Sequence, residues 1–446
     1  MKREGFGSKI GVIAATAGSA VGLGNIWKFP YITGQNGGAA FLLVYLLCVF
    51  LIGMPIVISE FSIGRAGKAN VVRSFRNLVP KKFWGLTGVL STVTTFIILS
   101  FYSMIAGWVI AYIYKAATAQ LSKVPSEELP NYFNSLISQP IVPIICTFLV
   151  LFITAFIVVS GVKDGIEKYS KILMPLLFVI LIVLMIRSLT LEGASKGLEF
   201  LFKPDFSKLT TKGILEALGH SFYSLSIAMG ILVTFGSYID KDQDIVNLSI
   251  SVTITDTLVA LMAGVVIFPA VFAYGFEPAA GPKLIFITLP AVFKSMPFGS
   301  LFETLFFILI AIAAITSTIS LLEVVVAVVT EEFKLERKKA TILITLGLFL
   351  LSIPSILSFG PWSHIKVFGK GFFDLFDFIA SNVFLPIGGL MICIFVAYAW
   401  GTNKVKEEVF QGKSSLLINI YNVIIKYFAP IAIIIIFLYF TGVIKI

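Results

Sequence analysis

Histidine and cysteine are scarce in this chain: its 446 residues include 2 His and 3 Cys. This scarcity argues against a disulfide framework and against a zinc site built from thiolate and imidazole. The cysteines, Cys48, Cys146 and Cys393, all fall inside apolar segments, where inert packing is the default. With only His220 and His364 present, and no paired His/Glu spacing, the sequence does not support an intramembrane enzyme.

Charge is scarce as well. Asp, Glu, Lys and Arg make up 13% of the residues, and hydrophobic residues make up 58%. A soluble domain carries about a quarter charged residues. With a mean hydropathy of +0.98, the composition indicates an all-α polytopic membrane protein. The net charge of +10 does not indicate nucleic-acid binding, because the basic residues gather in short loops.

Apolar runs separated by polar loops predict eleven membrane-spanning helices, each matched to a hydrocarbon core of about 30 Å. Between the seventh and eighth spans, residues 286–293 form an apolar segment too short to cross, which we expect to be a re-entrant cap over a cavity. The approximate bounds of the spans are 9–30, 36–63, 84–115, 141–160, 166–188, 213–237, 245–273, 299–330, 339–358, 372–400 and 423–443.

Basic residues predict the orientation of these spans. The N-terminus carries Lys2, Arg3 and Lys9, and the loop after the second span carries six more Lys and Arg residues within 65–82. Loops rich in Lys and Arg stay in the cytoplasm. We therefore expect the N-terminus inside, the C-terminus outside after an odd number of spans, and the chain in the inner (plasma) membrane of the cell.

Residues 17–30 (AGSAVGLGNIWKFP) interrupt the first span. Gly18, Gly22 and Gly24 each cost a helix interior roughly 1 kcal/mol relative to alanine. Close packing through small residues is one explanation of such glycines. However, Asn25 and Lys28 follow directly, and a helix broken at membrane depth must be buried in protein or face a wet cavity. The stretch therefore favours a binding site.

The sixth span has a second weak centre, residues 221–230 (SFYSLSIAMG). It occupies in 213–400 the place that the first break occupies in 9–188. Because each block holds five spans, the second is predicted to have inverted topology. Paired interrupted helices in two inverted halves indicate the midplane binding site of a transporter. We therefore expect one domain, 1–446, with a 5+5 inverted repeat, broken helices 1 and 6, and one extra helix, 423–443.

Polar side chains within the spans supply candidate ligands. Asp256 lies in the middle of the seventh span, where a carboxylate is costly and is a functional hypothesis by default; the alternative is structural bonding to neighbouring hydroxyls. Glu60 and Glu323 lie nearer the cytoplasmic ends and are expected to brace the broken helices. Thr316 and Ser317 offer hydroxyls that either bind a cation or bond back to their own helix. The broken helices add free carbonyls for a cation and free amides for a carboxylate.

The segments GSAVGLGNIWKFP (18–30) and NGGAAF (36–41) resemble the first-helix signature of the neurotransmitter:sodium symporter family. The resemblance covers essentially the whole chain in order. It implies the leucine-transporter-like form of the inverted-repeat fold, and the eleven spans are similar to those of the family's bacterial amino-acid transporters, such as the tyrosine transporters. The likeness continues through FYSMIAGW (101–108), the break 224–230, KDQDI (241–245), the segment 286–293, the pair 316–317 and DLFDF (374–378).

The resemblance also implies a role for particular positions. A first sodium site would use the substrate's carboxylate with Ala20, Asn25, Ser224 and Asp256. A second would use Gly18, Val21, Ala313, Thr316 and Ser317. The substrate would be bound by Ser19, Ala20, Gly22, Gly24, Ile98, Tyr102, Tyr223, Ser224, Ser226, Met229, Ser317 and Leu321. The outer gate would be Lys28 with Asp377, and the cytoplasmic gate would involve Arg3, Glu331 and Tyr238.

Departures from the family pattern bear on the ions and on the outer gate. Asp256 stands where many members have asparagine, and its charge replaces the chloride that relatives use to balance sodium, so we expect chloride independence. Lys28 stands where arginine is usual, and lysine lacks the planar bidentate fork, which predicts a looser gate. His220 stands where a glutamine often supports that gate; either it makes gating sensitive to pH or it makes an ordinary polar contact.

Other departures bear on the substrate. Gly22 stands where monoamine carriers place an aspartate for the substrate amine, so the substrate is expected to be an amino acid that brings its own carboxylate. Met229 is adaptable and Ser226 leaves room, which favours a large neutral, hydrophobic or aromatic side chain.

The sequence thus predicts a sodium-coupled symporter, not an enzyme, that imports a neutral amino acid by alternating access with two Na+ ions. Its partners would be the amino acid and the bilayer, with no nucleic acid, and its oligomeric state would be monomer or homodimer. Two alternatives remain open. One is a proton-coupled carrier of the same fold in which Asp256 titrates, and the other is a non-transporting amino-acid sensor.

Overall fold

The computed structural model describes residues 5–80, 83–276, 284–410 and 415–444. Within these ranges the chain is built almost entirely of helices, with one isolated β-bridge between Val367 and Lys370. Nine helical stretches are long and apolar enough to cross a membrane among the described residues, and a bent pair makes a tenth. The prediction of a polytopic helical membrane protein is therefore confirmed.

The first half runs from a broken helix to a long continuous one. Its elements are α1 (Lys9–Ala20), η1 (Gly24–Lys28), α2 (Phe29–Gln35), α3 (Ala39–Cys48), η2 (Val49–Gly53), α4 (Met54–Gly67), α5 (Val71–Leu78), α6 (Gly85–Ala117), α7 (Gln120–Lys123), η3 (Ser126–Glu128), α8 (Leu129–Ser138), α9 (Ile141–Val159), η4 (Val162–Glu167) and α10 (Lys168–Leu189).

The second half begins with a short helix and contains the second broken one. Its elements are α11 (Ala194–Phe202), η5 (Phe206–Lys208), α12 (Thr211–Ser224), α13 (Ile231–Gly236), α14 (Ile245–Ala273), η7 (Leu284–Thr288), α15 (Leu289–Lys294), α16 (Gly299–Phe333), α17 (Arg337–Leu357), α18 (Phe372–Asp377), η8 (Phe378–Phe384), α19 (Leu385–Ile394), η9 (Phe395–Gly401), α20 (Thr402–Val409), α21 (Ser415–Val423), η10 (Ile424–Phe428) and α22 (Ala429–Phe440).

The two expected breaks are both present in the backbone. α1 ends at Ala20, and its axis is bent by 49° from that of the helix that resumes at Gly24. α12 ends at Ser224 and α13 begins at Ile231, with no helix between them. Because the gap between α12 and α13 is longer than that between α1 and η1, the sixth predicted span is two short helices and not one span. Among the described residues, the nine long stretches and the bent pair thus correspond to ten of the eleven predicted spans, and the sixth corresponds to the two short helices α12 and α13.

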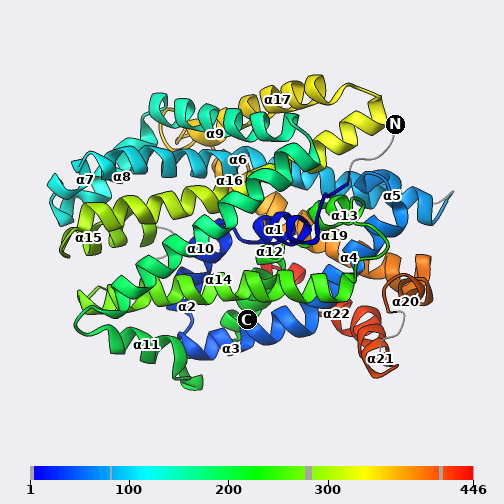
Figure 1. The fold of residues 1–446 in the computed structure, drawn as a ribbon. Coiled ribbons are helices and arrows are strands. Elements are labelled where there is room, and N and C mark those ends of the chain that lie inside the picture. Colours follow the sequence, from blue (N-terminus) through cyan, green and yellow to red (C-terminus); the bar gives the residue numbers. More distant parts are fainter. Residues whose placement is uncertain (1–4, 81–82, 277–283, 411–414, 445–446) are drawn as a thin grey trace.

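Long helices surround the broken ones. Figure 1 shows α6, α16, α10 and α14 running across the molecule, with α1 and α12 in the middle of the view. α6 packs along α16 and α9, α14 packs along α10 and α11, and α1 contacts α10, α14 and α16. The broken helices therefore lie inside a layer of continuous ones, as freed backbone at membrane depth requires.

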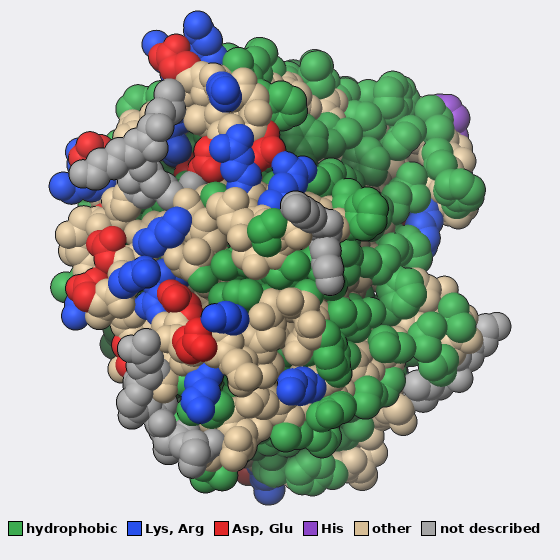
Figure 2. All heavy atoms as spheres, turned by 90° about the vertical axis from the view of Figure 1, so that its right-hand side faces the viewer, with side chains coloured by type: hydrophobic (Ala, Val, Ile, Leu, Met, Phe, Trp, Pro, Cys, Tyr) green, Lys and Arg blue, Asp and Glu red, His purple; other side chains and the backbone are tan. Residues whose placement is uncertain are grey.

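The two ends of the bundle differ in composition. α7, α8 and α15 gather at one end, and α5, α13 and α20 gather at the other, which is the end near the N-terminus (Figure 1). Figure 2 views that second end and shows Lys, Arg, Asp and Glu side chains gathered on it, with hydrophobic side chains along one flank. Leu284–Lys294 is the short apolar helix expected between the seventh and eighth spans.

Candidate functional site

The two helix breaks meet at a small cavity of about 30 Å³. The hydroxyl of Ser226, in the second break, donates to the carbonyl of Ser19 in the first at 3.2 Å. All twelve residues predicted to bind substrate line this one cavity, and Ile231, which the sequence did not suggest, also lines it. The lining residues are Ser19, Ala20, Gly22, Gly24, Ile98, Tyr102, Tyr223, Ser224, Ser226, Met229, Ile231, Ser317 and Leu321.

Side chains form hydrogen bonds with backbone groups that have no helical partner at the two breaks. The Gly22 N–H donates to Asn25 Oδ1 at 3.0 Å, and the Leu23 N–H donates to the Tyr102 hydroxyl at 3.1 Å. In the second break, the Thr95 hydroxyl donates to the Met229 carbonyl at 2.5 Å. Unpaired backbone groups in a membrane cost several kcal/mol each. These three bonds therefore help the chain to stay unwound where the cavity lies.

Gly22 has no room for a side chain. A Cβ atom there would lie 2.5 Å from Ser317 Oγ and 3.0 Å from the Tyr102 hydroxyl oxygen. An aspartate at this position would therefore have to displace both groups. Three elements thus lie too close together at Gly22 for an acidic side chain, and the cavity has no carboxylate at this position.

The residues expected at a first cation site form one hydrogen-bonded cluster. Asn25 Nδ2 donates to Asp256 Oδ1 at 2.7 Å, and the Ser224 hydroxyl donates to Asp256 Oδ2 at 2.8 Å. Tyr45, which the sequence analysis did not include, donates to Ser224 Oγ at 3.2 Å. Asp256, Asn25 and Ser224 are each at most 2% exposed. A hard cation prefers such carboxylate, amide and hydroxyl oxygens, so the cluster fits a sodium ion.

The residues expected at a second cation site also come together. The Ser317 hydroxyl donates to the Val21 carbonyl at 3.4 Å. The Thr316 hydroxyl bonds back to its own helix, the alternative raised for it above, and donates to the Ile312 and Ala313 carbonyls at 3.1 and 3.0 Å. A Cβ on Gly18 would lie 3.5 Å from Thr316 Cβ. The end of α1 thus faces the middle of α16 across carbonyl and hydroxyl oxygens. Among the described residues no group of three His, Cys, Asp or Glu side chains could hold a metal.

Two buried carboxylates hold the broken helices, as predicted. Glu60 Oε1 accepts from the Ala228 N–H at 2.7 Å, inside the second break. Glu323 Oε1 accepts from the Tyr238 hydroxyl at 2.6 Å, and Arg337 pairs with Glu323 Oε2 at 2.5 Å. Arg337 is the first residue of α17, in a stretch that the sequence analysis treated only as a basic loop, so its pairing with Glu323 was not predicted.

A larger cavity of about 390 Å³, here named the vestibule, borders the small one through Gly24, Tyr102 and Tyr223. Lys28 and Asp377 both line it. Lys28 Nζ lies 4.4 Å from the centre of the Tyr223 ring, and Asp377 accepts from the Ser381 hydroxyl at 2.8 Å. The expected gate residues thus share one cavity, and no ion pair joins them in the described chain.

Aromatic side chains from several elements form most of the vestibule wall. Phe286 of η7 stacks on Phe133 of α8, with ring centroids 5.0 Å apart. Trp108 of α6 packs on both Phe286 and Phe359. Phe286 of the segment 286–293 therefore lines a cavity. The sequence did not predict the contribution of α8, which adds Phe133, Asn134 and Ile137 to the wall.

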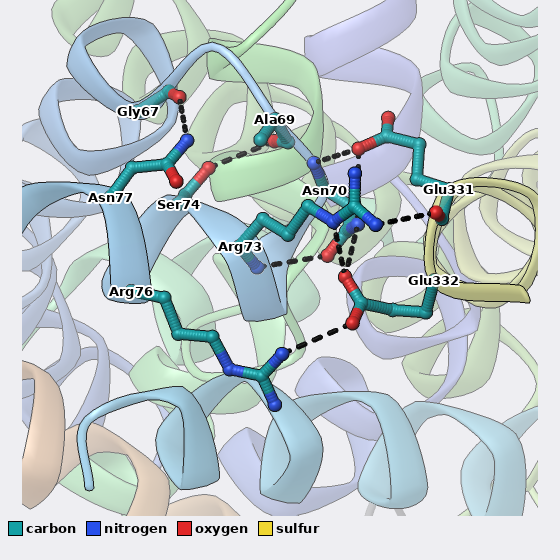
Figure 3. Close-up of polar contacts among 9 residues, drawn as sticks. All are labelled: Gly67, Ala69, Asn70, Arg73, Ser74, Arg76, Asn77, Glu331 and Glu332. Atoms are coloured by element: carbon teal, nitrogen blue, oxygen red, sulfur yellow. Dashed lines mark hydrogen bonds and ion pairs between the residues drawn. The ribbon is translucent and has the colours of Figure 1, made fainter. Parts of the chain in front are cut away.

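At the opposite end, Glu331 and its neighbour Glu332 join α16 to α5 (Figure 3). Glu331 Oε2 accepts from the backbone N–H of Asn70 at 2.9 Å and from its side-chain amide at 3.0 Å. Glu332 pairs with Arg73 at 2.7 Å and with Arg76 at 3.1 Å. These bonds tie the end of α16 to the helix that follows α4.

Tyr238, which is also expected at the cytoplasmic gate, lies close to α13. The Tyr238 ring packs edge-on to Phe6 at 6.1 Å, and Phe6 also packs on Phe235. The N-terminal segment is therefore held against α13 by aromatic contacts. Arg3, the expected cationic partner in this gate, lies outside the described residues.

A helical bundle in which two interrupted helices meet at one buried polar cavity is typical of a secondary transporter. The sodium:neurotransmitter symporter family model matches residues 3–135 and 137–445. The chain belongs to this family, and it is a sodium-dependent transporter and not an enzyme.

Individual relatives agree over the full length. The uncharacterized sodium-dependent transporter YhdH of Bacillus subtilis is 40% identical over 99% of this chain and 98% of its own. A sodium-dependent transporter of Methanocaldococcus jannaschii is 33% identical over 92% of this chain and 84% of its own. The crystal structure of MhsT in complex with L-phenylalanine is similar with a TM-score of 0.91 and 46% identity, over 98% of this chain and 99% of MhsT.

Proposed function

We propose that this protein imports a neutral amino acid with a large hydrophobic or aromatic side chain, coupled to two Na+ ions and independent of chloride. The observation that carries the proposal is the buried cluster of Asp256, Asn25 and Ser224 beside the cavity that Gly22 and Ser226 line. The binding of L-phenylalanine by MhsT supports the choice of substrate class.

Charge balance supports chloride independence. Asp256 receives hydrogen bonds from Asn25 and Ser224, and bonds of this kind to a carboxylate are short and strong. A sodium ion at the cluster would be neutralised by the carboxylate itself, so no external anion is needed there. The substrate's carboxylate would complete the ion's shell from the cavity side.

The mechanism follows from the two breaks. Sodium at the Thr316 and Ser317 hydroxyls would hold α1 against α16 and favour the state open to the vestibule. The substrate would enter through the vestibule, and Lys28 and Asp377 would then close above it. A cavity of about 30 Å³ has room for about one water molecule. A large side chain therefore requires Tyr223, Met229 or the break itself to move outward when substrate binds.

Release would occur at the end that carries α5 and α13. Loss of the second sodium would free α1 from α16, after which the contacts of Phe6 with Tyr238 and Phe235 separate. We place the protein in the inner (plasma) membrane, with the N-terminus in the cytoplasm, the C-terminus outside, and the two repeats at 9–188 and 213–400. Its assembly would be monomeric or dimeric.

A sodium-driven uptake screen over the twenty amino acids in proteoliposomes tests the proposal. We expect uptake of phenylalanine or another large neutral amino acid that needs an inward sodium gradient and is unchanged when gluconate replaces chloride. Uptake driven by a pH gradient in sodium-free medium would identify a proton-coupled carrier instead. Binding without uptake or counterflow would identify a sensor.

A further inference from the structure

The loop that joins α17 to α18 contains a tight turn at its tip. Val367 and Lys370 exchange backbone hydrogen bonds at 2.9 and 3.0 Å, which form the isolated β-bridge. The two residues between them, Phe368 and Gly369, both have a positive φ, at 51° and 75°. Two-residue turns of this kind favour Asn, Asp or Gly, and a bulky side chain with a positive φ is an outlier. The backbone at Phe368 is therefore strained.

Phe368 is also the most exposed large hydrophobic side chain of the described residues, at 93%. One exposed apolar side chain is ordinary on a protein surface. An exposed phenylalanine in a left-handed conformation is not, because neither the turn nor packing within the chain favours it. Strained backbone of this kind is typical of positions with a function. The side chain therefore fits a contact outside the chain.

The loop begins where α17 reaches the edge of the hydrocarbon core. α17 has 21 residues, which makes it about 32 Å long and matches a core of about 30 Å. It packs beside α9 on the outside of the bundle (Figure 1). One face of it, with Ile342, Leu343, Leu346 and Leu350, is 47–65% exposed and apolar, as a surface in contact with lipid would be. The loop that follows therefore starts at the level of the lipid headgroups.

Positive charge flanks the tip of the loop. Lys366 and Lys370 lie two residues before and after the exposed phenylalanine, and neither α17 nor the loop contains Asp or Glu. The Lys370 ammonium lies 4.7 Å from the centre of the Phe378 ring. Asp374 is the first acid after the loop, and a Cβ on Gly371 would lie 3.7 Å from its carboxylate and 3.6 Å from the Lys366 ammonium. Two cations near one acid leave the turn with a net positive charge, which suits the headgroups of anionic lipids.

The base of the loop is part of the vestibule wall. Phe359 and Phe373, at its two ends, have ring centroids 5.3 Å apart, and both line the vestibule. Gly360 lies against the Ser138 carbonyl of α8, which a Cβ at this position would overlap. A contact made at the tip would therefore help to hold this wall in place.

We propose that the turn 367–370 is a bilayer anchor. The Phe368 ring inserts into the headgroup layer, and the ammonium groups of Lys366 and Lys370 bind the phosphate groups of anionic lipids. Large aromatic side chains are stable at this level of a membrane, and lysine reaches it along its alkyl chain. The anchor ties the vestibule wall to the bilayer, so that the lipid composition affects the stability of the protein.

Thermal unfolding of the purified full-length protein in detergent tests the lipid contact, with added phosphatidylglycerol or phosphatidylcholine as probes. We expect phosphatidylglycerol to raise the unfolding midpoint more than phosphatidylcholine does. Phe368→Asn should lose most of that rise and yet unfold at the same or a higher temperature without lipid, because asparagine suits the turn. The double variant Lys366→Gln with Lys370→Gln should remove the difference between the two lipids. Phe206→Asn is the matched control, since Phe206 is 59% exposed and has no positive φ.

A nitroxide label on Phe368→Cys measures the depth of the tip in nanodiscs of the same lipids. Cys146→Ala removes the one native cysteine that is not buried. We expect the label to collide more with oxygen, which dissolves in the bilayer, than with a water-soluble nickel chelate. A label on Glu127→Cys, in the exposed segment between α7 and α8, should show the reverse.

Three results would overturn the proposal. The first is an equal accessibility of both labels to the nickel chelate, because the tip would then lie in water. The second is a phosphatidylglycerol effect that Phe368→Asn leaves unchanged or that Phe206→Asn reduces as strongly. The third is a dimer in detergent that Phe368→Asn dissociates, because the turn would then bind a second copy of the chain. None of these measurements depends on what the protein transports.

Discussion

Asp256 is a carboxylate fully buried among donors at the point where two broken helices meet. Its hydrogen bonds from Asn25 and Ser224 join α14 to both breaks. A buried charge is retained in a membrane protein chiefly where it has a function. The sequence pointed to this residue by its depth in the span, and the family resemblance grouped it with Asn25 and Ser224; the structure adds the hydrogen bonds that join them.

Asp256→Asn preserves the shape of this side chain and removes its charge. We expect the sodium concentration for half-maximal amino-acid uptake to rise by about tenfold or more, which corresponds to about 1.4 kcal/mol, and chloride to restore part of the activity. Sodium titrations of uptake in proteoliposomes, with and without chloride, measure both effects. Asp205→Asn, on an exposed turn, is the matched control. Unchanged sodium dependence in Asp256→Asn would remove this residue from the cation site.

Gly22→Ala tests how closely three elements meet at the first break. The added methyl group would press on Ser317 Oγ and the Tyr102 hydroxyl, so we expect amino-acid affinity to fall by about tenfold or more while the fold persists, a cost of about 1.4 kcal/mol. Gly347→Ala provides the control, since a Cβ there meets only Phe96 Cζ at an ordinary 3.5 Å. Equal amino-acid affinity in both variants would show that the backbone at the first break moves at little cost in free energy.

Residue roles at the outer gate were harder to predict from the sequence. The resemblance paired Lys28 with Asp377, whereas the structure places the Lys28 ammonium on Tyr223 and bonds Asp377 to Ser381. Sequence order carries no information about which of two reachable partners a long lysine side chain contacts in one conformation.

At the scale of single elements, α6 holds the second break in place through one hydroxyl. Thr95→Val removes the donor to the Met229 carbonyl without changing the side chain's shape. A buried acceptor left unpaired costs about 1–3 kcal/mol. We therefore expect a lower midpoint of thermal unfolding and weaker amino-acid binding, measured on the same detergent preparation. Thr92→Val is the control, because Thr92 bonds only to Gly88 of its own helix. Equal losses of stability and of amino-acid binding in the two variants would show that the Thr95 hydroxyl does not hold the second break.

The contact of α5 with the end of α16 is expected to influence which side of the protein is open. Arg73 and Glu332 are 41% and 21% exposed, and exposed ion pairs contribute about 0–1 kcal/mol. Arg73→Gln should therefore increase the inward-open population by at most about fivefold. The rate of maleimide labelling of a Thr234→Cys variant, measured from the cytoplasmic side, reports this population. Lys339→Gln is the control, since its pair with Glu336 is exposed and lies within α17 and its cap; no difference between the two would exclude α5 from gating.

At the scale of the whole molecule, the sequence predicted the membrane class, ten of the spans found among the described residues and the two breaks, because hydropathy and glycine content act locally. It predicted the members of the small cavity only through the resemblance to a family. Contacts such as Arg337 with Glu323 and Tyr45 with Ser224 depend on helices far apart in the chain. The hydrophobic periodicity of a helix indicates which of its faces is buried, but it does not indicate which other helix packs on that face.

Orientation is a further prediction for the whole molecule. The end that carries α5 and α20 displays many Lys and Arg side chains (Figure 2), and such loops remain in the cytoplasm. A C-terminal alkaline phosphatase fusion should therefore be active and a C-terminal green fluorescent protein fusion dark. The same reporters placed within 404–413 should give the opposite result. A fluorescent C-terminal fusion would show an inverted or incomplete topology.

α16 has 35 residues, which at 1.5 Å per residue makes it about 52 Å long. Thr316, at the second cation cluster, lies at the midpoint between Gly299 and Phe333. The proposed second sodium site therefore lies midway between the two ends of α16. A relative tilt of about 10° about that point would move the two ends by roughly 4 Å in opposite directions. A sodium ion bound there would thus lie at the pivot of a tilt that widens one end of the protein while it narrows the other.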